Sequence, residues 1–203
     1  MFLKRFFTSL ILSPLIIFMI LKGNWYFYSL LIIVSIIGLF EIIKINSLII
    51  SIIIFIIFSI FIFCSYKIIN LNNGSKLFLL ILIISWLSDI GGYIFGNIFK
   101  GKKIKIISPN KTYIGFLGSL LFGNLAILYN EYNQLFLFKN FYLYIIFFST
   151  ASFLVIIGDL AFSFFKRKCK IDDYSNILPG HGGLLDRIDG LIFLTIIFYT
   201  FVI

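Results

Sequence analysis

Seven long apolar segments, separated by shorter polar interruptions, dominate the pattern of hydrophobic and polar positions along this chain. They run over residues 6–21, 25–40, 47–66, 77–98, 113–130, 141–165 and 188–203. A helix needs roughly 20 apolar residues to cross the hydrocarbon core of a bilayer. Because a spanning segment must satisfy its own backbone hydrogen bonds, we expect these segments to be helices. The pattern predicts an all-α, polytopic integral membrane protein with about seven transmembrane helices.

The polar interruptions differ in length, and two of them, 99–112 and 166–189, are long and rich in charge. No soluble linker or repeat separates the segments, so we expect a single membrane domain over residues 1–203. Within it, residues 1–76 would form N-terminal helices, and residues 77–203 would carry the catalytic helices and the two long loops. The first segment follows a charged start but lacks an Ala-x-Ala-like cleavage site, so we expect a retained transmembrane helix.

The composition excludes a soluble globular domain and a disordered chain. Of the 203 residues, 61% are apolar and only 12% are charged, with a mean hydropathy of +1.11, whereas a soluble domain is about 25% charged. The two cysteines, Cys64 and Cys169, lie in different segments without a CxxC spacing. We therefore expect neither a disulfide nor a zinc site.

The distribution of cations predicts the orientation. The chain has 17 Lys and Arg against 8 Asp and Glu. With the N-terminus inside, 13 cations fall on the inner side and 4 on the outer side. The outer four are Lys22, Lys67, Lys76 and Lys139. Because cytoplasmic loops carry the Lys and Arg excess, we expect a multi-pass protein of the cell (inner) membrane with both long loops in the cytoplasm.

Several acidic residues lie within or beside the apolar segments, where a carboxylate is expensive. An Asp near the bilayer centre costs about 2.5–3.5 kcal/mol, so such residues usually line a cavity or a site. Asp89 is followed by Gly92 and Gly96 at i+3 and i+7, which places the carboxylate and two small residues on one helix face. This pattern is typical either of a functional site or of a packing face with one hydrogen-bonded acid.

Two further groups of acids have the same two interpretations. Asp159 shares a predicted helix face with Ser163 and Lys166, and Asp186 and Asp189 share a face at the start of the last helix. Taken alone, Asp159 could be a helix-end acid offset by cations, and the other pair could complement a helix N-terminus.

The last loop gathers charges of both signs. It places five cations (Lys166, Arg167, Lys168, Lys170, Arg187) beside four acids (Asp172, Asp173, Asp186, Asp189). Carboxylates hold Mg²⁺ together with substrate phosphates, and Lys and Arg neutralise phosphate charge. The glycine-rich run 179–183 lets the backbone approach a phosphate. Its His181, the only histidine, is either a phosphate contact or proton carrier, or a loop residue bonded to backbone. The combination predicts phosphoryl or nucleotidyl transfer to a lipid.

Several ordered motifs then carry a resemblance to a known family. They are Ser-Pro-Asn-Lys-Thr-Tyr-Ile-Gly-Phe at 108–116, Gly-Asp-Leu at 158–160, Ser-Phe-Phe-Lys-Arg at 163–167 and Pro-Gly-His-Gly-Gly-Leu-Leu-Asp-Arg-Ile-Asp at 179–189. With them, roughly residues 80–190 resemble the phosphatidate cytidylyltransferase (CDP-diacylglycerol synthase) family. Asp172 stands where that family usually has lysine.

The resemblance implies that CTP and phosphatidate give CDP-diacylglycerol and diphosphate at a lipid bilayer, without a nucleic-acid partner. It assigns the metal site to Asp159, Asp186, Asp189 and Asp89, for Mg²⁺ with a second, monovalent cation left open. It assigns catalysis to Lys166, Arg167, His181 and Arg187, and substrate binding to Ser108, Lys111, Thr112, Ser163, Gly182 and Gly183. Oligomeric state, including a homodimer, is left open.

Three alternatives remain at this level. A related CTP-dependent lipid or polyprenol kinase would transfer the γ-phosphate instead. A small ion or solute transporter would also carry intramembrane acids, although the chain lacks the inverted repeats typical of that class. An inactive descendant with a scaffolding role is the third, because of Asp172.

Overall fold

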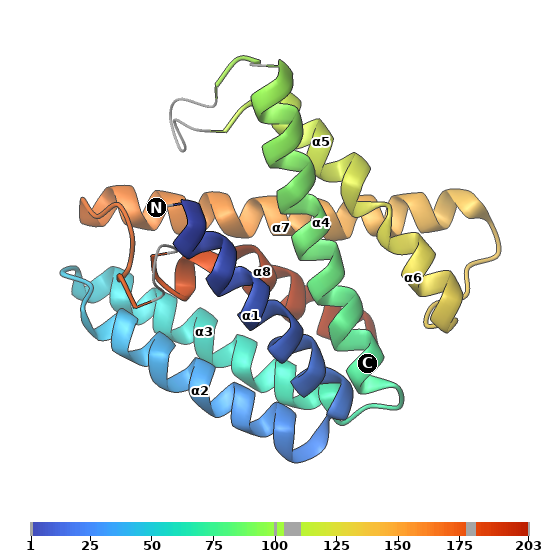
Figure 1. The fold of residues 1–203 in the computed structure, drawn as a ribbon, viewed down its shortest axis with the longest axis horizontal. Coiled ribbons are helices and arrows are strands. Elements are labelled where there is room, and N and C mark those ends of the chain that lie inside the picture. The colour runs from blue at the N-terminus through green and yellow to red at the C-terminus, as the bar shows by residue number, and fades with distance from the viewer. Residues whose placement is uncertain (1, 100, 104–110, 178–181, 203) are drawn as a thin grey trace.

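The described residues, 2–99, 101–103, 111–177 and 182–202, form eight helices and no sheet in the computed structural model (Figure 1). The helices are α1 (Phe2–Lys22), α2 (Asn24–Ile43), α3 (Leu48–Ile69), α4 (Gly74–Phe99), α5 (Tyr113–Gly123), α6 (Ala126–Asn133), α7 (Phe141–Cys169) and α8 (Leu185–Val202). Five stretches, α2, α3, α4, α5 with α6, and α7, are long and apolar enough to cross a membrane. The predicted all-α, multi-pass membrane fold is confirmed.

The fifth predicted segment, 113–130, is broken into α5 and α6. The break falls at Gly123 and Asn124, and the side-chain amide of Asn124 donates to the carbonyl oxygen of Leu120 and the hydroxyl of Ser149, both at 2.8 Å. An Asn side chain that bonds nearby backbone competes with the helix ladder. Hydropathy alone registers no such break, because the flanking residues stay apolar.

The two helices that flank the last loop extend beyond their apolar runs. α7 continues to Cys169, and its last turn carries Lys166, Arg167 and Lys168, where the helix dipole favours cations. α8 begins at Leu185, three residues before its predicted start. Polar residues at the end of a span are still helical, so an apolar pattern underestimates both lengths.

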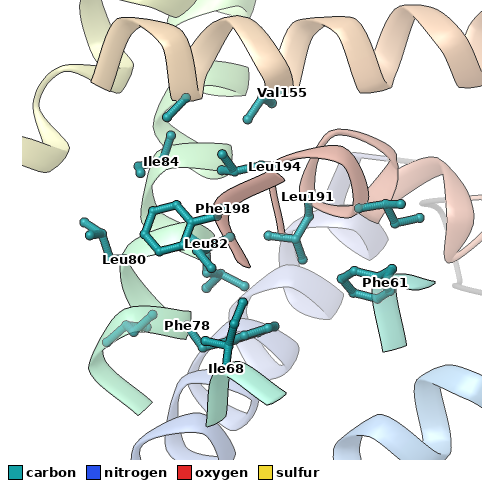
Figure 2. Close-up of a cluster of buried hydrophobic side chains, with 14 of the residues drawn as sticks. Phe61, Ile68, Phe78, Leu80, Leu82, Ile84, Val155, Leu191, Leu194 and Phe198 are labelled. Carbon is teal, nitrogen blue, oxygen red and sulfur yellow. The ribbon is translucent and has the colours of Figure 1, made fainter. Parts of the chain in front are cut away.

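The apolar core lies where α3, α4, α7 and α8 meet (Figure 2). Its buried side chains include Phe61 and Ile68 of α3, Phe78 and Leu80 of α4, Val155 of α7, and Leu194 and Phe198 of α8. α8 is thus packed against α3, α4 and α7. This packing fixes the helix that begins with Asp186, Arg187 and Asp189.

The most extensive contact between two helices joins α4 and α5. Glycines line it from both sides: a Cβ added at Gly118 would lie 2.5 Å from the carbonyl oxygen of Gly91, and one at Gly115 would lie 2.9 Å from that of Gly92. Small residues permit such close backbone approach between membrane helices. The sequence prediction that glycines after Asp89 mark a close helix contact is confirmed for Gly92.

Candidate functional site

A cavity of about 340 Å³ opens between α4, α5, α7 and α8, within the range of about 300–1,000 Å³ typical of small-molecule sites. Its charged lining consists of Asp89, Lys111, Asp159, Asp186, Arg187 and Asp189. The remaining wall is formed by small, aromatic and polar residues: Gly92, Tyr93, Gly96, Asn97, Thr112, Gly115, Phe116, Ser119 and Ile156. Four aspartates from three separate helices, α4, α7 and α8, therefore line one cavity.

Two of these aspartates are brought together by a glycine contact between α7 and α8. A Cβ at Gly158 would lie 2.6 Å from the carbonyl oxygen of Asp189, and one at Gly190 would lie 2.6 Å from the side chain of Val155. Asp159 follows the first glycine and Asp189 precedes the second. The close approach of the two backbones is thus what places both carboxylates on the cavity wall.

The opposite wall comes from α4 and the start of α5. Asp89 faces the cavity from α4 and accepts no hydrogen bond from the described part of the chain. Thr112 is the N-cap of α5, and its hydroxyl oxygen accepts a 3.0 Å hydrogen bond from the backbone N–H of Gly115. This cap fixes the direction in which the chain enters α5, and with it the position of Lys111.

Lys111 and Asp159 form an ion pair across the cavity, and each side chain is 28% exposed. The charges of Asp89, Asp159 and Asp189 also act on one another, and those of Lys111 and Arg187 oppose them. Carboxylates held this close are mutually unfavourable unless cations compensate them. The cavity therefore carries both acidic and basic side chains, as expected for a site that binds a cation together with a polyanion.

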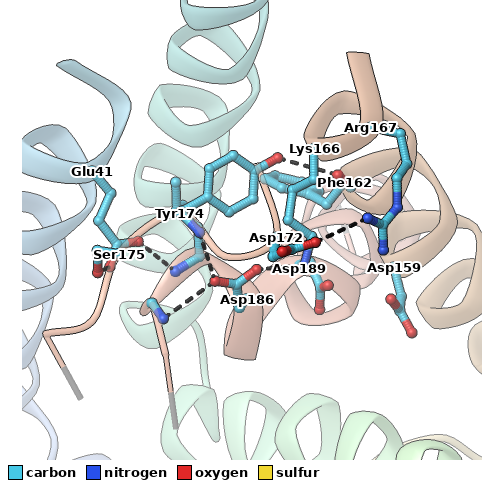
Figure 3. Close-up of polar contacts among 12 residues, drawn as sticks. Glu41, Asp159, Phe162, Lys166, Arg167, Asp172, Tyr174, Ser175, Asp186 and Asp189 are labelled. Atoms are coloured by element: carbon cyan, nitrogen blue, oxygen red, sulfur yellow. Dashed lines mark hydrogen bonds and ion pairs between the residues drawn. The ribbon is translucent and has the colours of Figure 1, made fainter. Parts of the chain in front are cut away.

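Asp186 is held by three donors (Figure 3). The Nζ of Lys166 donates to Oδ1 at 2.6 Å, and the backbone N–H groups of Tyr174 and Gly183 donate to Oδ2 at 3.0 and 3.2 Å. These contacts tie the end of α7 and both ends of the last loop to the first turn of α8.

Tyr174 also anchors the first part of this loop to α7. Its hydroxyl donates to the carbonyl oxygen of Phe162 at 3.2 Å, and its side chain is buried. Burial, together with the nearby charges of Asp186 and Asp189, raises the pKa of the Tyr174 phenol well above its usual value. The phenol therefore stays a hydrogen-bond donor.

The structure brings some of the predicted site residues together and leaves others apart. Asp89, Asp159, Asp186, Asp189, Lys111, Thr112 and Arg187 line the cavity. Lys166 contacts Asp186, and Gly183 donates to the same carboxylate, but neither is among the described residues that line the cavity, nor are Ser163, Gly182 and Arg167. Ser108 and His181 lie outside the described residues.

The family-atypical Asp172 lies away from the cavity. Its carboxylate accepts a 3.1 Å bond from Arg167, and the two side chains are 93% and 52% exposed. An exposed pair of this kind contributes little to stability. The aspartate at this position therefore adds no charge to the cavity wall.

Sequence reasoning missed Glu41, Asn97 and Ser119. Asn97 and Ser119 line the cavity, and nothing in their local pattern singles them out. Glu41, at the end of α2, is fully buried and reaches the loop before α8. Glu41 could have been found from the sequence, because it is an acidic residue at the edge of an apolar span, where an acid usually has a structural or functional partner.

The donor set of the cavity suits a hard divalent cation. Mg²⁺ takes oxygen ligands and commonly uses one or two protein carboxylates, with water and substrate phosphates completing its shell. The described residues hold no group of three or more His, Cys, Asp or Glu side chains arranged as a ready metal site. Four aspartates around one cavity, with Asp89 accepting no hydrogen bond from the described residues, fit a cation that arrives with a phosphate ligand.

Fold and site together define a helical, multi-pass membrane protein with an aspartate-lined cavity between its helices. Residues 44–203 match the model of the cytidylyltransferase family, and the chain belongs to that family. Similar proteins include the phosphatidate cytidylyltransferase of Staphylococcus epidermidis, 41% identical over 125 residues, and those of Staphylococcus haemolyticus and Staphylococcus aureus, 37% and 39% identical over 127 residues. Each alignment covers 60% of this chain and 47% of the relative, so the chain spans about half the length of the relatives it matches.

Proposed function

We propose that this chain is a phosphatidate cytidylyltransferase, which makes CDP-diacylglycerol and diphosphate from CTP and phosphatidate at the cytoplasmic face of the cell membrane. The observation that carries the proposal is the cavity in which four aspartates face Lys111 and Arg187 beside a glycine-lined wall. The four aspartates outnumber the two cations of the lining, and this excess of acids suits a divalent cation that arrives with a triphosphate. The names of the relatives support the same substrates.

The reaction asks for little covalent chemistry from the protein. A phosphate oxygen of phosphatidate attacks the α-phosphorus of CTP, a new P–O bond forms, and the bond from that phosphorus to the bridging oxygen breaks as diphosphate leaves. Both reactants are anions, so catalysis consists mainly of holding them together and stabilising the negative charge. Lys111, just before α5, and Arg187, in the first turn of α8, are the two cations among the described lining residues and are available for that role.

The remaining residues orient these groups. Asp159 holds Lys111 over the cavity through their ion pair. Lys166 holds Asp186, which in turn binds the backbone of the last loop. Mg²⁺, bound by one or two of the cavity's aspartates and by the nucleotide phosphates, would neutralise phosphate charge and polarise the P–O bonds.

The orientation rests on the asymmetry of the cations, with 13 of 17 on the side of the two long loops. The cavity is lined by residues at the ends of those two segments: Lys111 and Thr112 end the first, 99–112, and Asp186 and Arg187 lie near the end of the second, 166–189. A site at this level meets cytoplasmic CTP from one side and the lipid headgroup from the other.

The test uses purified protein, phosphatidate, Mg²⁺ and CTP labelled separately on the α- and γ-phosphates. The proposal expects α-label in the lipid phase and release of diphosphate. γ-Label in the lipid with release of CDP would instead identify a lipid kinase, and no label in lipid with any divalent cation would contradict the proposed function. Asp186→Asn should abolish labelling while the protein still inserts in the membrane, whereas Asp172→Asn, at the exposed pair, should leave it unchanged.

A further inference from the structure

A buried carboxylate from the N-terminal helices reaches the start of α8. Glu41, near the end of α2, is 0% exposed. Its Oε1 accepts hydrogen bonds from the hydroxyl of Ser175 at 2.5 Å and from the N–H of Leu184 at 2.7 Å, and its Oε2 accepts one from the N–H of Leu185 at 2.8 Å. Figure 3 shows Glu41 and Ser175 together beside the loop. The contacts span more than 130 residues of sequence.

These contacts supply a helix cap that the local sequence lacks. The first N–H groups of a helix have no partner within it, and they are usually bonded by Ser, Thr, Asp or Asn just before the helix. Before α8 stands Leu184, whose side chain has no acceptor. The carboxylate of Glu41 takes that place, and the positive end of the helix dipole favours its charge.

Glu41 and Asp186 also hold the same stretch of backbone from two sides. A Cβ at Gly183 would lie 3.0 Å from Oε1 of Glu41 and 2.8 Å from Oδ2 of Asp186, so a larger residue here would push against both carboxylates. Asp186 lies one residue beyond the N–H of Leu185 that Glu41 binds. Glu41 therefore holds the backbone directly before Asp186, while packing against α3, α4 and α7 holds the rest of α8.

We propose that Glu41 is a positioning residue of the nucleotidyl-transfer site, which sets the first turn of α8 and hence the cavity groups that the turn carries. The inference rests on the proposed function for its kinetic consequence. It gives the N-terminal helices a part in the site, since Glu41 lies just before residue 44, where the family match begins.

The test compares Glu41→Gln with Glu131→Gln, because these are the only two glutamates in the sequence and Glu131 is exposed on α6. A glutamine keeps the size but turns one acceptor into an N–H donor that faces a backbone N–H. We expect Glu41→Gln to raise the half-saturating Mg²⁺ concentration and the KM for CTP by about 10- to 100-fold, as loss of an outer-shell partner does. Glu131→Gln should match the wild type. Faster amide hydrogen exchange at Leu184 and Leu185 should accompany the kinetic change.

A merely structural role would lower the active fraction and the maximal rate, and would leave KM and the Mg²⁺ dependence unchanged. That result, or wild-type kinetics and exchange in Glu41→Gln, would overturn the inference. Ser175→Ala removes one of the three hydrogen bonds to Glu41 and replaces Glu41→Gln as the test if that variant does not fold. It should raise the KM for CTP and the half-saturating Mg²⁺ concentration by a smaller factor. Unchanged values of both would count against the inference. Absence of product from the wild type would overturn the proposed function instead, while the exchange measurement would still decide whether Glu41 holds α8.

Discussion

Lys166 and Asp186, twenty residues apart, form an ion pair of 2.6 Å at the junction of α7 and α8, with side chains that are 16% and 5% exposed. The pair is positioned beside the cavity, and its lysine contacts the carboxylate rather than the cavity itself. The ion pair therefore joins α7 to the first turn of α8 by electrostatic attraction, in addition to the packing between the two helices.

The first prediction concerns this pair. Lys166→Met leaves the carboxylate of Asp186 without its cation in a nearly buried place, and breaking one side of a buried pair costs about 3–5 kcal/mol. We expect the lower end, because two backbone N–H groups still bind Asp186. Unfolding in detergent measures the loss, and the exposed Lys168→Met serves as the control.

The double variant, Lys166→Met with Asp186→Asn, sharpens the result. Without either charge, stability should partly recover while activity does not. If the double variant were as unstable as Lys166→Met alone, the loss would come from packing of the lysine stem and not from the unpaired carboxylate.

The second prediction concerns the ion pair of Lys111 with Asp159. If Asp159 orients Lys111 toward a substrate phosphate, Lys111→Met and Asp159→Asn remove the same arrangement and their effects are not additive. We expect an interaction free energy of about 0.5–3 kcal/mol between them in kcat/KM for CTP. Strictly additive effects would mean that the two residues act independently.

The third prediction concerns the glycine contact between α7 and α8. Gly158→Ala places a methyl group 2.6 Å from the carbonyl oxygen of Asp189, a backbone atom that cannot move without its helix. We expect a loss of about 1–3 kcal/mol in stability from overpacking and a larger proportional loss of activity, because Asp159 and Asp189 are displaced. Ile146→Ala, at a side chain of α7 that is exposed outside the protein core, is the control in both assays.

Much of this fold could be predicted from the sequence because membrane crossing imposes a simple rule. Apolar runs near 20 residues become helices, and acids that interrupt them mark sites, so Asp89, Asp159 and Asp189 were found from local pattern. The helix break after Gly123 could not be predicted from the sequence, because it depends on the hydrogen bond from the side chain of Asn124 to Ser149 on α7.

The partners of the charges were harder to predict than their presence. Lys166 and Arg167 stand next to each other in a motif for which the resemblance implies a catalytic role, yet one binds Asp186 and the other the exposed Asp172. Neighbours on a helix point in different directions, so only the surrounding helices decide their roles. The contact from Glu41 to α8 joins two segments with no shared pattern.

The last prediction concerns alkaline pH. Burial raises the pKa of Tyr174 in the folded protein, while the unfolded phenol ionises near pH 10. Below that pH both states are protonated and the contribution to stability is complete; above it the unfolded state gains by losing its proton, so stability falls as pH rises. Tyr174→Phe loses the hydrogen bond to Phe162, which costs about 1 kcal/mol of stability at neutral pH. Because phenylalanine has no proton to lose, the stability of this variant should decline less than that of the wild type above about pH 10. Urea unfolding in detergent across this range measures the slope, with the exposed Tyr132→Phe as the matched control. Equal slopes for wild type and Tyr174→Phe would show that the phenol is as easily ionised in the folded chain as in the unfolded one.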